Sequence, residues 1–385
     1  MPSSRPAWTP GAPGSPSSTP WPAPSPCAGA ARRGWVKVEG VRAERLPPLV
    51  SPWIVGALIL LCLLAALVTY KASGSLATIA RVHGSHTLAP RAEWLATSSA
   101  SAAVRPLLRT ANYFAIVWPA LVFGVLIGGA VRAVVPSAWV ARLFGDTSLR
   151  SQLVGGLAGA PLMLCSCCVA PVFAAVQERT RRGGAAGALM LASPSLNPAA
   201  LALTFMLFTT EVALARLAMA FLLVFGVSAL AARYLPSPEV AYAPCPLEGE
   251  GPKGPREALT SFAHEVARLA RTTVPLIIAG VLLSSLLIDL LPVDRLREAP
   301  VRIAAVLLVA LVSVPLALPT FAEIPLALGL LAGGAPAGAA VALMIAGPAI
   351  NLPSLLTVSR TTTARHAVAL AVGTFLLAVA GGLLV

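Results

Sequence analysis

The sequence predicts an all-α polytopic membrane protein with two homologous repeats of about four hydrophobic segments each and proline-broken helices at the repeat interface. Charged residues make up 11% of the chain, against roughly 25% in soluble domains. Apolar residues make up 57%, so most of the chain needs lipid to bury its side chains. Residues 161–197 also return at 315–351, with 13 of 37 aligned positions identical. Duplicated apolar halves with matching polar interruptions are typical of membrane transporters.

Nine segments carry the roughly 20 apolar residues that a bilayer crossing needs. One precedes the duplication and four fall in each copy. Irregular backbone facing lipid would leave its polar groups unpaired, so we expect helices or half-helices packed against protein. The segments are 52–70, 113–135, 153–176, 185–208, 212–232, 274–291, 303–331, 337–358 and 367–385.

The predicted organisation has five parts. Residues 1–50 are rich in Pro, Ser and Ala and are expected to be disordered, unless translation starts after them. Residues 51–104 form an extra transmembrane helix and a loop that begins near residue 71. Repeat 1 spans 105–235 and repeat 2 spans 272–385. Residues 236–271 are the linker, ending in a short amphipathic helix at about 256–269.

The formal net charge of +13 does not indicate nucleic acid, because the Lys and Arg residues are spread over every loop and tail. They are better explained as determinants of membrane topology, with the lipid bilayer as partner. Their even spread leaves the orientation open. Parallel and inverted repeats also remain alternatives, because the choice depends on whether one broken segment is re-entrant.

Two prolines bracket a Cys-Ser-Cys-Cys run at residues 165–168. Each proline removes an amide donor and clashes with the preceding turn, so we expect the helix to open within the membrane. Pro171 suits the first turn of a new half-helix, whose positive dipole end would point toward the sulfurs. The structural alternative is that the prolines only kink the helix.

A second pair of breaks is predicted at residues 193–198 and 347–351, each containing Pro and Asn. Four breaks, two from each copy, would meet near the midplane and form a polar pocket. Its expected polar groups are the amides of Asn197 and Asn351 and the hydroxyls of Ser166, Ser193, Ser195 and Thr320.

Glu323 lies inside an apolar segment, two positions before Pro325. An acidic side chain at the centre of a membrane helix is unfavourable by roughly 2.5 to 3.5 kcal/mol on insertion scales. Glu323 could accept a substrate proton, carry a coupling proton or hold a cation. A capping hydrogen bond at the broken helix is the structural alternative.

Three of the six cysteines lie within four residues, at 165, 167 and 168. Isolated buried cysteines are common as small apolar residues, but a cluster favours a function. Soft sulfur ligands select thiophilic species such as trivalent arsenic, Cu(I) or Zn. The four histidines lie outside the predicted span interiors, which disfavours an imidazole site. Cys165 and Cys168 also have C-x-x-C spacing, so a membrane thiol-disulfide oxidoreductase is the alternative function.

These motifs resemble a known family. Residues 161–171 (PLMLCSCCVAP), 321–325 (FAEIP) and 347–353 (GPAINLP) are similar to the paired motifs of the predicted permease family that includes ArsP-type organoarsenical efflux permeases. The resemblance covers about residues 105–375. It implies a multi-spanning inner-membrane permease, with trivalent organoarsenicals as the substrate of one branch.

Two departures from the family pattern bear on the substrate. Family members have a Cys-x-Cys-Gly run, and here Cys168 stands at the glycine. Many members also carry a cysteine near the place of residues 319–321, where this chain has none. The resemblance therefore carries over the thiols of the first motif only.

The sequence thus predicts a multi-pass secondary permease of the bacterial cytoplasmic membrane rather than an enzyme. It would move a small solute, with thiophilic metalloid or metal species such as trivalent (organo)arsenicals as candidates. No cofactor is expected and no nucleotide-binding motif occurs. The oligomeric state is open, a homo-oligomer included. The predicted substrate-binding residues are Cys165, Ser166, Cys167, Cys168, Asn197, Thr320, Glu323 and Asn351.

Overall fold

A computed structural model describes eight stretches of the chain. The expectations for the tail at 1–50 and for residues 236–253 of the linker lie outside the described residues. Every described helix belongs to one compact unit, Pro48–Val385. The described stretches are 52–88, 93–98, 100–135, 137–145, 148–180, 184–234, 254–290 and 302–385.

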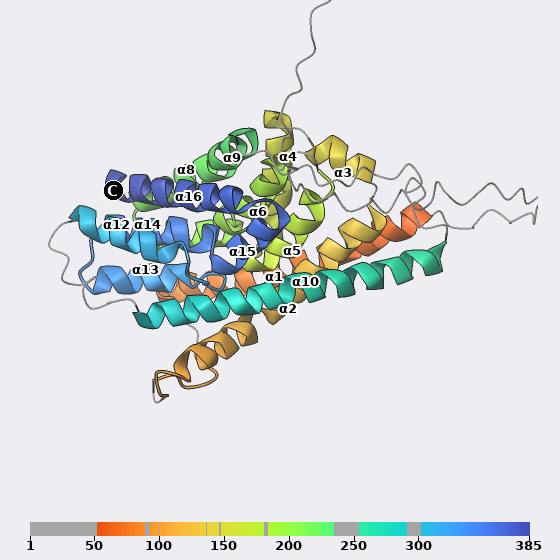
Figure 1. Ribbon diagram of the computed structural model, residues 1–385. Coiled ribbons are helices and arrows are strands. Elements are labelled where there is room, and N and C mark those ends of the chain that lie inside the picture. Colours follow the sequence, from red (N-terminus) through yellow and green to blue (C-terminus); the bar gives the residue numbers. More distant parts are fainter. Residues whose placement is uncertain are drawn as a thin grey trace, which may run out of the picture. The chain divides into compact units, whose positions relative to one another are not determined.

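Helices account for all the regular structure in these stretches, so the predicted all-α class is confirmed (Figure 1). The first half of the chain contains α1 (Pro52–Ser85), α2 (Arg105–Val134), α3 (Ser137–Phe144), α4 (Leu149–Gly159), the 3₁₀ turn η2 (Ala160–Leu162), α5 (Ser166–Gln177), α6 (Gly184–Ser195), α7 (Pro198–Leu207), α8 (Thr210–Phe221), the π-helical η3 (Leu222–Val227) and α9 (Ser228–Tyr234). The second half contains α10 (Pro255–Leu290), α12 (Arg302–Ser313), α13 (Glu323–Ala332), α14 (Ala337–Ala349), α15 (Leu352–Thr361) and α16 (Ala364–Leu384).

Six described helices or helix runs are long and apolar enough to cross a membrane, where the sequence predicts nine segments. The bent pair α14 and α15 makes a seventh if it counts as one span. The remaining apolar helices, α5, α12 and α13, are shorter than 18 residues. Three predicted segments account for the difference: 337–358 is the bent pair, and two others are each divided into shorter helices.

The two divided segments are 153–176 and 303–331. The chain leaves the helix at residues 163–165 and again at 314–322. Each opening contains a residue in the left-handed region, Met163 with φ 49° and Phe321 with φ 73°. Positive φ is unfavourable for side chains of this size, and such strain clusters at functional sites.

The predicted end of the first span is wrong in the opposite direction, and the predicted amphipathic helix does lead into the next span. Helix α1 runs on to Ser85, past the predicted end at residue 70. The predicted amphipathic helix at 256–269 and the span after it are one helix, α10, with Pro275 inside it. A single proline within a long helix removes only one backbone bond, and packing against neighbours tolerates it.

Helices α2 and α10 pack along each other and join the two halves of the chain (Figure 1). Further contacts between the halves link α5 to α15, α6 to α14, and α7 to α13. A small apolar cluster connects α1 to both halves of the chain. In it, Val82 of α1 packs with Leu203 of α7 and Ile324 of α13.

Two glycines allow close backbone packing on α2 and α10. A Cβ on Gly124 would lie 2.0 Å from the carbonyl oxygen of Cys168 in α5. A Cβ on Gly280 would lie 2.6 Å from Cα of Pro353 in α15. Helix α2 therefore packs directly on the backbone of α5, and α10 packs directly on the backbone of α15, with no side chain between them.

We predict that Gly124→Ala destabilises the protein by about 1 to 3 kcal/mol, because the added methyl group forces α2 and α5 apart. Thermal unfolding of the purified protein in detergent measures the effect. Gly74→Ala in α1 is the matched control, since no heavy atom lies within 4 Å of its added Cβ. Equal midpoints for the two variants would contradict the packing described here.

Candidate functional site

The cysteine run lies at the opening between α4 and α5. After η2, Met163 turns the chain into the left-handed region and Cys165 is extended at the N-cap of α5. Helix α5 begins at Ser166, and Pro171 lies inside it. The prediction that Pro171 occupies the first turn is therefore wrong. The break, at residues 163–165, ends with Cys165, so the positive end of α5 lies at Cys165 itself.

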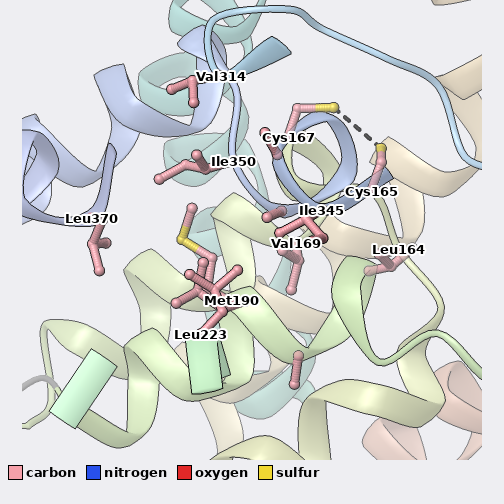
Figure 2. Packing of buried hydrophobic residues seen from close by; sticks show 14 of the residues in the cluster. Leu164, Cys165, Cys167, Val169, Met190, Leu223, Val314, Ile345, Ile350 and Leu370 are labelled. Atoms are coloured by element: carbon pink, nitrogen blue, oxygen red, sulfur yellow. Dashed lines mark hydrogen bonds between the residues drawn. The ribbon is translucent and has the colours of Figure 1, made fainter. Parts of the chain in front are cut away.

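The three sulfur atoms form one cluster. Sγ of Cys165 lies 3.2 Å from that of Cys167 and 2.8 Å from that of Cys168, and Figure 2 shows the first of these contacts. The sulfurs of Cys167 and Cys168 are 3.7 Å apart. The Tyr113 hydroxyl of α2 lies 2.8 Å from Sγ of Cys167. All three thiols are buried and free, an arrangement that could hold one soft ion or metalloid atom.

Ser193 of α6 holds the opened backbone beside the cluster. Its Oγ accepts a hydrogen bond from the Leu164 amide at 3.0 Å and lies 3.2 Å from the Leu164 carbonyl oxygen, to which it donates. A main chain without helical partners must be satisfied by protein inside an apolar bundle. Ser193 therefore stabilises the opening rather than facing a solute.

The second opening, at 314–322, leads into α13, which begins at Glu323. The Glu323 carboxylate pairs with the Arg216 guanidinium of α8 at 3.0 Å. The other terminal nitrogen of Arg216 donates to the Thr204 hydroxyl of α7 at 2.7 Å. Arg216 and Glu323 are 1% and 2% exposed, so the pair is buried between the two halves of the chain.

Sequence reasoning missed Arg216. The signal was available, because Arg216 is the single charged residue within the apolar segment 212–232. A charge inside a membrane segment usually faces the bundle interior and has a partner. Its presence changes the interpretation of Glu323, whose charge is already balanced by a cation.

The two predicted asparagines cap helices. Oδ1 of Asn197 accepts from the amides of Ala199 and Ala200 at the start of α7. Oδ1 of Asn351 accepts from the Ser354 amide at the start of α15. Both side chains therefore have a structural role, although Nδ2 of Asn351 is buried without a hydrogen-bond partner.

A hollow lies where the openings approach each other, and this hollow is called pocket A below. Its empty space, open side included, is about 250 Å³, but the enclosed part has room for only about one water-sized group. Cys165, Asn197, Thr320 and Glu323 are the predicted site residues that line it. Ser166, Cys167, Cys168 and Asn351 are buried nearby without lining it. The other lining residues are Leu164, Pro194, Leu318, Pro319 and Pro348.

Among the described residues, six long apolar helices indicate a multi-pass membrane protein, and a hollow between opened helices is typical of membrane transporters. The ArsP_1 family, described as a predicted permease, matches residues 104–385. The chain belongs to this family of predicted permeases. Helix α1 lies before the matched residues.

Two curated relatives are similar to the chain. UPF0718 protein YraQ of Escherichia coli (strain K12) is 27% identical over 244 residues, which cover 63% of this chain and 70% of the relative. UPF0718 protein MJ0584 of Methanocaldococcus jannaschii is 34% identical over 82 residues, covering 21% of this chain and 22% of the relative. No solved structure matches the chain.

We predict that Arg216→Gln destabilises the protein by about 3 to 5 kcal/mol, because it leaves the buried Glu323 carboxylate without its partner. The double variant Arg216→Gln/Glu323→Gln removes both charges and is expected to recover most of that loss. Thermal unfolding in detergent compares the two. Equal destabilisation by the single and double variants would show that the charges are not coupled.

A second prediction concerns the opening at 163–165. In a variant with Cys27, Cys62 and Cys245 replaced by serine, alkylation of the remaining thiols should be slow until the protein is denatured. Ser193→Ala removes the partner of Leu164 and should accelerate alkylation several-fold, as followed by intact mass.

The matched control is Ser313→Ala, a buried serine whose hydroxyl bonds within its own helix turn to Val309. Its alkylation rate should equal that of the parent. Equal acceleration by both substitutions would indicate general loosening of the bundle instead of loss of the Ser193 contact.

Proposed function

We propose that the protein is a secondary permease that moves a small solute across the bacterial cytoplasmic membrane by alternating access. Pocket A carries the proposal. Its lining includes opened or helix-capping backbone from both halves of the chain, at Leu164 and Asn197 on one side and at Leu318 and Thr320 on the other. Pockets between broken helices of two halves are the usual solute sites of such transporters.

The two halves are proposed to be homologous repeats related by a pseudo-two-fold axis. In the proposed correspondence, α2, α5, α6 and α7 match α10, α13, α14 and α15. The contacts between the halves support it, because α5 contacts α15 and, equivalently, α13 contacts α7. Helices α2 and α6 also contact their own counterparts, α10 and α14. The positions of Asn197 and Asn351 at corresponding helix starts agree with it. The packing departs from strict symmetry, since α2 lies on α5 whereas α10 lies on α15.

The proposed solute is thiophilic, with trivalent (organo)arsenicals as one candidate. Three sulfur atoms within 4.8 Å of one another offer a compact soft donor set. Cys165 connects this cluster to pocket A, because its side chain belongs to both. Asn197, Thr320 and Glu323 would then contact the solute directly, while Ser166, Cys167, Cys168 and Asn351 complete the surrounding shell.

The size of pocket A supports a transport cycle with at least one other state. Its empty space of about 250 Å³ includes the open side, so the arrangement described here is nearly closed. Relative movement of the halves would enlarge it. The strained residues Met163 and Phe321, one at each opening, are suitable points for the backbone to change conformation.

The alternative of a thiol-disulfide oxidoreductase is less well supported. Disulfide exchange needs a thiol that another protein can reach, and the exposed fractions of Cys165 and Cys168 are 4% and 0%. Family membership also favours transport over redox chemistry.

Uptake and survival assays test the proposal. Cells expressing the protein are compared with cells lacking it during exposure to trivalent organoarsenicals, arsenite, Cu(I) and Zn. The variant Cys165→Ser/Cys167→Ser/Cys168→Ser is expected to lose at least about tenfold in transport of the solute that gives a phenotype, because it lacks the soft ligands.

Cys62→Ser is the control, since Cys62 lies on the exposed face of α1. It should transport as the parent does. Unchanged transport in the triple variant would reject the thiol site while leaving the permease assignment in place.

A further inference from the structure

Arg216 lines a second hollow, called pocket B below. Its empty space, open side included, is about 180 Å³. Arg216 and Ser195 are its polar lining residues, and its remaining walls are the apolar Ala220, Leu223, Met344 and Ile345. Leu223 and Ile345 are among the packed core residues drawn in Figure 2. Pocket B is thus an apolar hollow with one cationic and one hydroxyl group.

The donors in pocket B are only partly used. A guanidinium has five N–H groups, and the structure records hydrogen bonds from Arg216 to Thr204 and Glu323. Ser195 is 4% exposed, and its Oγ is buried without a hydrogen-bond partner. A buried hydroxyl without a partner is unfavourable by about 1 to 3 kcal/mol in mutational data. Ser195 therefore points to a missing ligand.

Arg216 and Ser195 together suit an oxyanion. A planar guanidinium binds carboxylate, phosphate or sulfate oxygens through paired hydrogen bonds, and a serine hydroxyl donates one more. Apolar walls strengthen these bonds because they exclude water. In this arrangement pocket B has room for about one water-sized group, so a small oxyanion such as acetate, sulfate or inorganic phosphate fits only where the Glu323 carboxylate has left the guanidinium.

Glu323 is the group that an oxyanion would have to replace. The elements packed against α8 are α7, α14, α16 and η3. Of these, α7, α14 and η3 carry no charged residue, and α16 carries only Arg365 and His366. Within α8 the other charged residue is the exposed Glu211 of the first turn. Among the described residues, Glu323 therefore provides the counter-charge of Arg216.

We propose that Arg216 and Ser195 form a binding subsite for a small oxyanion, which displaces the Glu323 carboxylate from the guanidinium. The displaced carboxylate turns into pocket A, which it already lines. Because Arg216 is on α8 and Glu323 is on α13, this exchange breaks an ion pair between the two halves of the chain. Oxyanion binding and separation of the halves are thereby linked. The subsite goes beyond the proposed function and does not depend on the cysteines.

Thermal unfolding of the purified protein tests the subsite. The protein is held in non-ionic detergent without added phospholipid, and sulfate, inorganic phosphate or acetate is titrated against chloride at constant ionic strength. A ligand that binds only the folded protein raises the midpoint with concentration. We expect at least one of the three anions to raise it and chloride to leave it unchanged.

Substitutions assign the effect to named residues. Glu323→Gln removes the competitor and should tighten apparent oxyanion affinity on the order of tenfold or more. Ser195→Ala removes one charge-assisted hydrogen bond and should weaken affinity on the order of tenfold. The double variant Arg216→Gln/Glu323→Gln is the matched neutral control and should show no response. If Glu323→Gln is too unstable in chloride, purification in sulfate should rescue it.

Four results would overturn the subsite. Two concern the variants: an increase in the midpoint of the neutral double variant equal to that of the parent, or no gain in anion affinity from Glu323→Gln. The other two are failure of sulfate to stabilise an unstable Glu323→Gln variant, and a midpoint that rises with added phosphatidylglycerol but with none of the free anions. The triple cysteine variant should keep its oxyanion response. Loss of thiophilic transport with retention of this response separates the failure of one proposal from the failure of the other.

Discussion

Opened main chain in the middle of an apolar bundle must find its hydrogen-bond partners within the protein, because lipid offers none. This constraint explains why small polar residues, serine and asparagine, lie around the candidate site. Ser193 satisfies Leu164, and the Ser284 hydroxyl of α10 accepts from the Ala317 amide at 2.8 Å in the other opening. The asparagines satisfy the first amides of α7 and α15. Several polar side chains that the sequence suggests for solute binding are therefore needed to keep the backbone open.

The same constraint separates groups that support the site from groups available to a ligand. Cys165 and Glu323 line pocket A, and Ser195 has an unused hydroxyl in pocket B. Glu323 differs from the others because it is held by Arg216 across the two halves. A buried ion pair is weak evidence for stability, since desolvation offsets much of the attraction. Its position between the halves agrees with the proposal that the contact is made in one state and exchanged in another.

Composition and the internal duplication were enough to predict an all-helical membrane protein and to locate both openings approximately. The details depended on contacts that no local pattern contains. The sequence predicts a helix break bracketed by two prolines, yet the second of them, Pro171, lies inside the continuous helix α5, because neighbouring helices can compensate for one lost bond. Arg216 stands out locally as a charge in an apolar segment, but its pairing with Glu323, 107 positions away, is visible only in the fold. The cysteines, Asn197, Thr320 and Glu323 were identified from their types, whereas only the fold shows which of them share a hollow.

Helix α1 lies before the residues that match the family, yet its Val82 packs with Leu203 and Ile324, residues on opposite sides of the seam between the halves. Ile324 directly follows Glu323 in α13. Any sliding of α7 against α13 must therefore carry the end of α1 along or break its contacts. In the proposed transport cycle α1 would therefore brace the two halves, and we expect its removal to alter the speed of the cycle before the choice of solute.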